Sequence, residues 1–79
     1  MNWKGKEIKN IGETLSAMTD CKNRDEALDF IKAYEIYCDT PEIAHSNMGY
    51  IMGYISSPDE RNRVINLFKV PHPVFGMSY

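Results

Sequence analysis

Several features that define large protein classes are missing from this sequence. No apolar run approaches the ~20 residues that a membrane-spanning helix needs, so no membrane segment is expected. Residues 1–6 read Met-Asn-Trp-Lys-Gly-Lys and lack the apolar stretch of about 7–15 residues found in a secretory signal. No long repeat or low-complexity tract occurs. These absences predict a folded protein of the cytoplasm.

Cysteine is scarce. Cys21 and Cys38 are the only two in the chain, and neither has another Cys or His at metal-ligand spacing. Two reduced, partly buried thiols are expected, with a disulfide between them as the alternative. No glycine-rich phosphate loop, Ser-His-Asp arrangement or paired-carboxylate signature is present either. The sequence therefore disfavours an enzyme, and it predicts no metal and no cofactor.

Positive charge is also limited, with 9 Lys and Arg against 11 Asp and Glu, for a net charge of -2. General nucleic-acid binding is not expected, because it depends on clustered Lys and Arg. The charge is uneven: residues 20–42 hold seven acids and three bases, a difference of -4. The sequence thus predicts one acidic face.

What the sequence does contain is helical periodicity. A length of 79 residues with 43% hydrophobic content suits one helical domain, residues 1–79. Helices are predicted from near Ile11 to residue 19 and over residues 24–38, 41–56 and 58–69. Each start has a capping residue: Asn10, Asn23, Thr40 and Ser57.

The predicted fold class is all-α: a small bundle of three to four helices with an extended Pro-rich C-terminal tail over residues 70–76. No strand pattern of useful length is found. His45 is expected to be solvated. On the third helix a core stripe is predicted from Ala44, Met48, Ile51 and Ile55. A core of this size contributes only about 3–5 kcal/mol, so self-association into a homo-oligomer is expected.

Two glycines in the third helix need a reason, because glycine inside a helix costs about 1 kcal/mol relative to alanine. Gly49 and Gly53 either allow tight helix packing or form a groove with Tyr50 and Tyr54 as its walls. Packing is the more common case. Aromatic residues at helical spacing belong to the core more often than to a ligand site. Core positions are therefore expected for Tyr34, Tyr37, Tyr50, Tyr54 and Phe68.

Two further features could carry chemistry. Arg61 and Arg63 follow a helix start, where guanidinium groups and free amides suit an anion, although pairing with nearby Asp59 and Glu60 is the more common arrangement. His72, between two prolines, could make a directed ligand contact, although a lone histidine is more often structural.

The motif Asn47-Met-Gly-Tyr-Ile-Met-Gly-Tyr54, an arginine in the next turn and His72-Pro-Val-Phe-Gly76 resemble a family of small phage and prophage proteins. Their pattern reads N-x-G-Y-x-x-G-Y, then R, then H-P-x-F-G. The resemblance covers residues 24–76 and implies a phage or prophage origin, in the cytoplasm of an infected or lysogenic bacterial host. Carried over by motif, with either Arg61 or Arg63 filling the arginine position, the candidate ligand-binding residues are Asn47, Gly49, Tyr50, Gly53, Tyr54, Arg61, Arg63, His72 and Phe75.

The chain resembles phage sponges that sequester nucleotide immune signals in its size, its expected origin and its residue types. This comparison is an analogy. The leading hypothesis is a non-enzymatic homo-oligomer that captures a small nucleotide-like or phosphorylated ligand. The alternative is an interaction module that inhibits a host protein through acids on the second helix, Asp25, Asp29 and Glu35. An enzyme using His72 ranks third.

Overall fold

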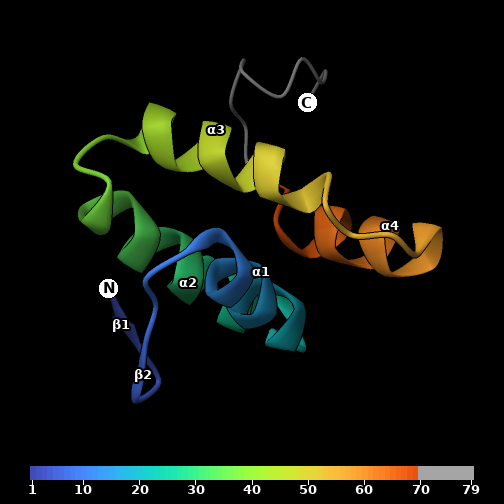
Figure 1. The fold of residues 1–79 in the computed structure, drawn as a ribbon, viewed down its shortest axis with the longest axis horizontal. Helices are drawn as coiled ribbons and strands as arrows, with labels where there is room; N and C mark the ends of the chain where they lie inside the picture. The colour runs from blue at the N-terminus through green and yellow to red at the C-terminus, as the bar shows by residue number, and fades with distance from the viewer. Residues whose placement is uncertain (70–79) are drawn as a thin grey trace.

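The computed structural model describes residues 1–69, which form a bundle of four helices preceded by a short hairpin (Figure 1). The helices are α1 (Ile11–Asp20), α2 (Arg24–Tyr37), α3 (Pro41–Met52) and α4 (Pro58–Leu67). The strands are β1 (Asn2–Trp3) and β2 (Lys6–Glu7). The all-α prediction is confirmed, whereas the predicted extended tail, residues 70–76, lies outside the described residues.

The four helix starts are the predicted ones. In each case the side-chain oxygen of the preceding residue accepts a hydrogen bond from the backbone N–H three residues later, which satisfies an otherwise unpaired donor. The donor–acceptor distances are 2.9 Å at Asn10, 3.0 Å at Asn23, 3.2 Å at Thr40 and 3.4 Å at Ser57. Local sequence chemistry therefore determines where each helix begins.

The third helix ends earlier than predicted, at Met52 and not at residue 56. Gly53 caps it, and the backbone N–H groups of Tyr54 and Ile55 bond three residues back, to Ile51 and Met52. Glycine is a poor helix former, so the helix gives way here to a tighter turn. Ile55 still lies in the core, at 7% exposure.

The hairpin is absent from the sequence prediction. Its turn places Lys4 at φ 52° and Gly5 at φ 80°, and two left-handed residues are what a tight two-residue hairpin loop requires. Strands of two residues are too short to show an alternating pattern. The hairpin carries Trp3, which packs edge-on against Phe30 with ring centroids 5.2 Å apart.

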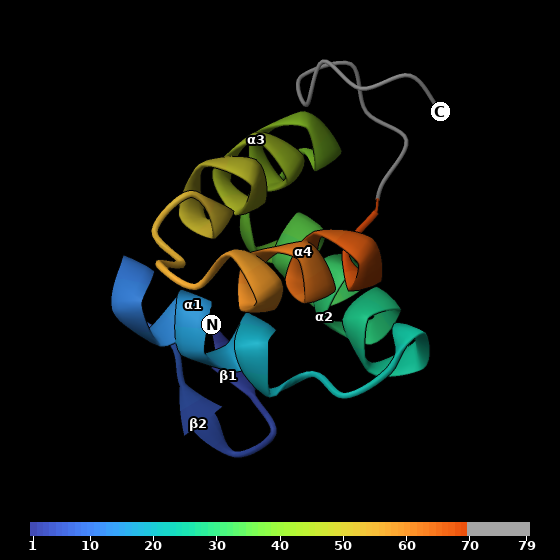
Figure 2. The same cartoon turned by 90° about the vertical axis from the view of Figure 1, so that its right-hand side faces the viewer.

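The core lies between the helices and is organised around Phe30. Phe68 contacts the Phe30 ring at 5.8 Å, and the predicted stripe on α3 is buried as expected. In both views α3 forms one outer layer and the hairpin lies at the opposite side, with α1 and α2 between them (Figures 1 and 2). Among the described helices, none covers the outward side of α3.

Candidate functional site

The predicted site residues fall on two helices and a segment beyond them. Asn47, Gly49 and Tyr50 lie on α3, and Gly53 and Tyr54 follow directly after its last residue. The two arginines, Arg61 and Arg63, belong to α4. His72 and Phe75 lie outside the described residues.

Tyr50 and Tyr54 form a pair on the surface. Their side chains are 62% and 55% exposed, so the expectation that they are core residues is wrong. The rings meet edge to face at 5.3 Å, and the two hydroxyl oxygens lie 2.6 Å apart. This hydrogen bond raises the pKa of Tyr54, because Tyr50 supports its protonated form. Both phenols are therefore ordered before anything binds.

The pair continues into a longer line of tyrosines. Asn47 lies three residues before Tyr50 on α3, and helical residues at that spacing are neighbours. The Asn47 side chain also reaches the Tyr34 hydroxyl, whose pKa is raised chiefly by burial and lowered in part by this hydrogen bond. Tyr34 in turn stacks on Tyr37 at 6.0 Å. We call these five residues, Tyr34, Tyr37, Asn47, Tyr50 and Tyr54, the tyrosine row.

Tyr37 is the member of the row that the sequence placed wrongly. It was expected in the core, but it is 55% exposed and is the last residue of α2. Tyr34 and Phe68 are buried as expected. The sequence signal for the row was the spacing of three residues between Tyr34 and Tyr37, which places two helical side chains next to each other.

Most of the row comes from a segment that carries no charge. Residues 43–58 contain no Asp, Glu, Lys or Arg in a chain that is 25% charged. Ile43, two helical turns before Tyr50, adds a 50% exposed apolar side chain to the same side. Protein interfaces are depleted in charge at their centres and enriched in aromatic residues, so this composition is typical of a contact surface.

Gly53 is not a helix-crossing residue. A Cβ atom added there would lie 3.2 Å from the Tyr50 carbonyl oxygen of its own helix, and no atom of another helix is closer. Its role is local, because it caps the end of α3. Gly49, one turn earlier, is half-buried.

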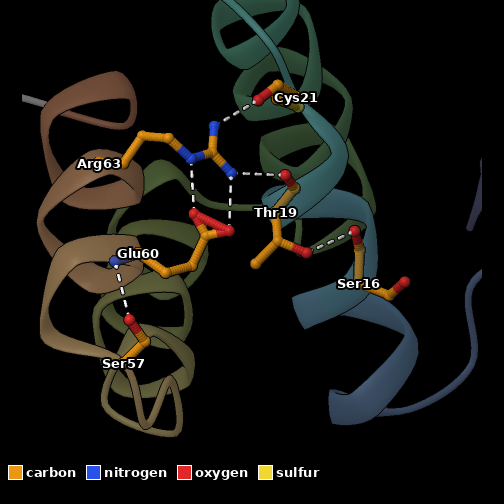
Figure 3. A network of polar contacts seen from close by, with 6 residues as sticks. All are labelled: Ser16, Thr19, Cys21, Ser57, Glu60 and Arg63. Carbon is orange, nitrogen blue, oxygen red and sulfur yellow. Dashed lines mark hydrogen bonds and ion pairs between the residues drawn. The ribbon is translucent and has the colours of Figure 1, made fainter.

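The two arginines are used inside the fold. Arg61 donates through Nε and Nη2 to the Ile55 carbonyl, at 3.1 and 2.9 Å. Arg63 donates to the carbonyl of Cys21 at 3.0 Å and to that of Thr19 at 2.7 Å, while Glu60 accepts from its Nε at 2.6 Å (Figure 3). The structural pairing anticipated for Arg63 is thus present, and both guanidinium groups hold helix ends together.

His45 contradicts its sequence prediction. It is 7% exposed and not solvated, and its Nε2 atom lies 2.6 Å from a carboxylate oxygen of Glu35. The contact joins α3 to α2. Glu35, one of three acids assigned to a partner-facing surface, is therefore engaged inside the chain.

The remaining acidic residues leave a smaller charged surface than expected. Asp25 and Asp29 are exposed and line an open hollow of about 430 Å³ on α2. Lys32 and the ion pair of Lys4 with Glu26, at 3.3 Å, line the same hollow. This face is mixed in charge, unlike the uncharged tyrosine row.

Both thiols are un-ionised at neutral pH. Burial raises the pKa of Cys21 to about 11, and it also raises that of Cys38. Both cysteines are free, as expected. Within residues 1–69, no group of three or more His, Cys, Asp or Glu side chains is arranged to hold a metal ion.

Comparison with models of protein families, with curated proteins and with solved structures finds no match to this chain. The resemblance to small phage proteins stays a prediction. In the described part of the chain, no helix is both long and apolar enough to cross a bilayer. The candidate site is therefore argued from its own geometry.

Proposed function

We propose that this protein is a binding module that docks on a partner protein through the tyrosine row. The observation that supports this role is the exposure of Tyr37, Tyr50 and Tyr54, each more than half accessible, the last two in a segment without charged residues. An exposed tyrosine stabilises a contact by burying a large ring, and it loses few rotamers in doing so.

The geometry makes the row ready for contact. The Tyr50 and Tyr54 phenols hold each other in place, so little ordering is needed when a partner binds. Their hydroxyls keep unused hydrogen-bonding capacity, which a partner backbone can fill. The centre of such a contact is apolar and aromatic, and its specificity comes from shape and from the phenol and Asn47 amide groups.

The nucleotide-like ligand predicted from the sequence stays a prediction, and fewer of the residues expected to bind it are available. A base could stack on Tyr50 or Tyr54. However, the Arg61 and Arg63 side chains that were expected to hold phosphate already donate to carbonyl and carboxylate oxygens. A partner protein, which needs no phosphate clamp, fits the row better.

The cellular setting belongs to the same proposal. A phage or prophage origin, a counter-defence role, the cytoplasm of the bacterial host and a homo-oligomeric state all follow from the family resemblance and the small core. A host protein is the partner class that suits this setting.

The test compares the row with the acidic face. Tagged wild-type protein is recovered from the cells in which it naturally acts, beside a Tyr50→Ser/Tyr54→Ser variant and a control, Asp25→Asn/Asp29→Asn. All four positions are exposed, so each variant is expected to fold. Native mass spectrometry then reports the copy number and any bound protein or small molecule.

We expect a host protein on the wild type and on the acidic-face control, and its loss from the tyrosine variant. Binding through an uncharged surface should also persist when the salt is raised from about 0.1 to about 1 M, because only charged contacts are strongly screened. Loss in the acidic-face control with steep salt dependence would instead support the acidic-face alternative. A retained small mass with no partner protein would support ligand capture.

A further inference from the structure

An open hollow lies beside Tyr54, between α1 and the start of α4. Its volume is about 380 Å³, within the range of about 300–1,000 Å³ that small-molecule sites occupy. Residues of α1 form one wall, and the turn after α3 forms the other together with the first turn of α4. Tyr54 is the member of the tyrosine row that lines it. The hollow therefore adjoins the row without coinciding with it.

Neutral hydroxyl groups dominate the polar lining of the hollow. Ser16 and Thr19 lie on α1, and Ser56 and Ser57 lie in the turn that leads into α4. The Thr19 hydroxyl donates to the carbonyl oxygen of Ser16 at 3.0 Å and can still accept a hydrogen bond. The Ser57 oxygen accepts from the backbone N–H of Glu60 and still has its own proton to donate. The hollow thus offers both donors and acceptors.

Glu60 is the single charged side chain among the described residues that line the hollow. Arg63 already donates to both of its carboxylate oxygens, from Nε at 2.6 Å and from Nη2 at 3.2 Å. This hydrogen bonding lowers the pKa of Glu60, so the carboxylate is ionised and paired at neutral pH. A bound anion would lie next to this carboxylate, and no Lys or Arg of the described lining would offset the repulsion. A neutral ligand avoids that cost.

Tyr54 and Ile55 give the hollow an apolar side. The Tyr54 ring is 55% exposed, and its hydroxyl is held by the hydrogen bond with that of Tyr50, at 2.6 Å. The face of an aromatic ring is electron-rich, so it attracts the polarised C–H groups on one face of a sugar ring. A sugar also carries hydroxyl groups around its edge, which both donate and accept. The aromatic ring and the hydroxyl lining match these two features.

The walls of the hollow are fixed by contacts within the fold. Arg63 on α4 donates to the carbonyl oxygens of Thr19 and Cys21 at the end of α1, at 2.7 and 3.0 Å (Figure 3). Arg61 donates to the Ile55 carbonyl oxygen and so holds the turn after α3. Both walls are therefore in place before a ligand arrives, and little ordering opposes binding.

We propose that this hollow binds a neutral sugar, with Tyr54 against the ring face and the Thr19 and Ser56 hydroxyls bonded to the sugar hydroxyls. An extended peptide suits the site less, because such peptides form main-chain hydrogen bonds at a sheet edge and, within residues 1–69, no strand lines the hollow. The sugar site does not rest on the proposed partner docking, since most of the tyrosine row lies outside it.

Nuclear magnetic resonance of the isotope-labelled full-length protein, titrated with glucose, maltose and cellobiose, tests the proposal. We expect at least one of these sugars to bind in the millimolar range and to shift the backbone signals of Thr19 and Tyr54, while that of Asp29 on α2 stays in place. Glucuronate, the negatively charged analogue of glucose, should bind at least several-fold more weakly than the neutral sugars. No shift with any neutral sugar at tens of millimolar, or tighter binding of glucuronate, would overturn the proposal.

The same titration with soluble starch and cellulose fragments identifies the source of the sugar. Binding of the polymer that is tighter than binding of the matching disaccharide supports a polysaccharide, and the reverse supports a free sugar.

The matched variants are Tyr54→Ser and Thr19→Val/Ser56→Ala in the hollow and Ile36→Ser outside it. None of these side chains is buried, so each variant is expected to fold. Both hollow variants should weaken sugar binding at least several-fold, whereas Ile36→Ser should not change it. Tyr54→Phe keeps the ring and should retain most of the binding. Equal sugar affinity in the wild type and in Tyr54→Ser would refute the placement of the site.

Partner capture separates the sugar site from the proposed function. Tyr37→Ser, in the row but outside the hollow, should weaken partner capture and leave sugar binding unchanged. Thr19→Val/Ser56→Ala should do the opposite. Loss of the partner from this hydroxyl variant, in a protein that binds no sugar, would assign the hollow to the partner and overturn the sugar site. The two proposals can thus fail independently.

Discussion

Removing the Arg63 guanidinium is expected to destabilise the fold by about 2 kcal/mol. Its side chain is 39% exposed, so the ion pair with Glu60 is screened and adds little. The main loss is the pair of hydrogen bonds to Thr19 and Cys21, whose carbonyls end α1 and have no helical partner. Bonds from charged donors contribute about 1.5–3 kcal/mol each when shielded from water, and the partial exposure of this side chain reduces each to about 1 kcal/mol.

The variant for this test is Arg63→Met, which keeps the aliphatic stem, with Arg63→Lys and Arg61→Met as comparisons. Lysine keeps the charge but cannot reach two carbonyls in a fork, so it should recover part of the loss. Arg61→Met removes bonds to a single carbonyl, that of Ile55, and should cost about 1 kcal/mol. Urea unfolding followed by circular dichroism gives the free energies, and 2 kcal/mol corresponds to a fall in Tm of about 8–16 °C. An Arg63→Met protein within about 0.5 kcal/mol of wild type would refute the reasoning.

Three other outcomes follow from the same structure. Folding raises the pKa of the Cys21 thiol from 9.0 to about 11, so between these pH values the thiol is protonated in the folded state and ionised in the unfolded state. The free energy of unfolding should therefore fall as pH rises from about 9 to about 11. Cys21→Ala should flatten that part of the pH curve; an identical slope in both proteins would contradict the assignment. Glu35→Ala should cost about 1–3 kcal/mol by removing the partner of the buried His45 imidazole, and Glu35→Gln less, in chemical denaturation; equal losses would argue against a hydrogen-bonding role. Met48→Ala should cost about 2–5 kcal/mol and Ile36→Ser less than about 0.5, in the same assay, and similar values for the two would contradict the placement of the core.

The helix starts were predictable because a cap is a local event. Asn23, for example, accepts a hydrogen bond from a residue three positions away, and both partners are visible in the sequence. The core stripe of α3 was predictable for a similar reason, since helical periodicity alone places Met48 and Ile51 on one face. No knowledge of the rest of the chain was needed.

Features that depend on distant residues were not predictable. Burial of His45 depends on Glu35, which only the α2–α3 packing brings within 2.6 Å. Arg63 finds carbonyls 42 and 44 residues away, and its sequence neighbours gave no sign of them. The exposure of Tyr37 and Tyr50 likewise depends on how the helices pack, which the aromatic spacing does not reveal.

The meeting of Trp3 and Phe68 on one ring, Phe30, has a consequence for synthesis on the ribosome. Trp3 belongs to the first described strand and Phe68 directly follows the last described helix, yet they share a single neighbour. A nascent chain can form α1 and α2 early, because each has its own cap, but Phe30 lacks one of its ring contacts until Phe68 has left the exit tunnel. Stable folding therefore waits for nearly the whole described chain, and a ribosome stalled within α4 would present an open core to chaperones and proteases.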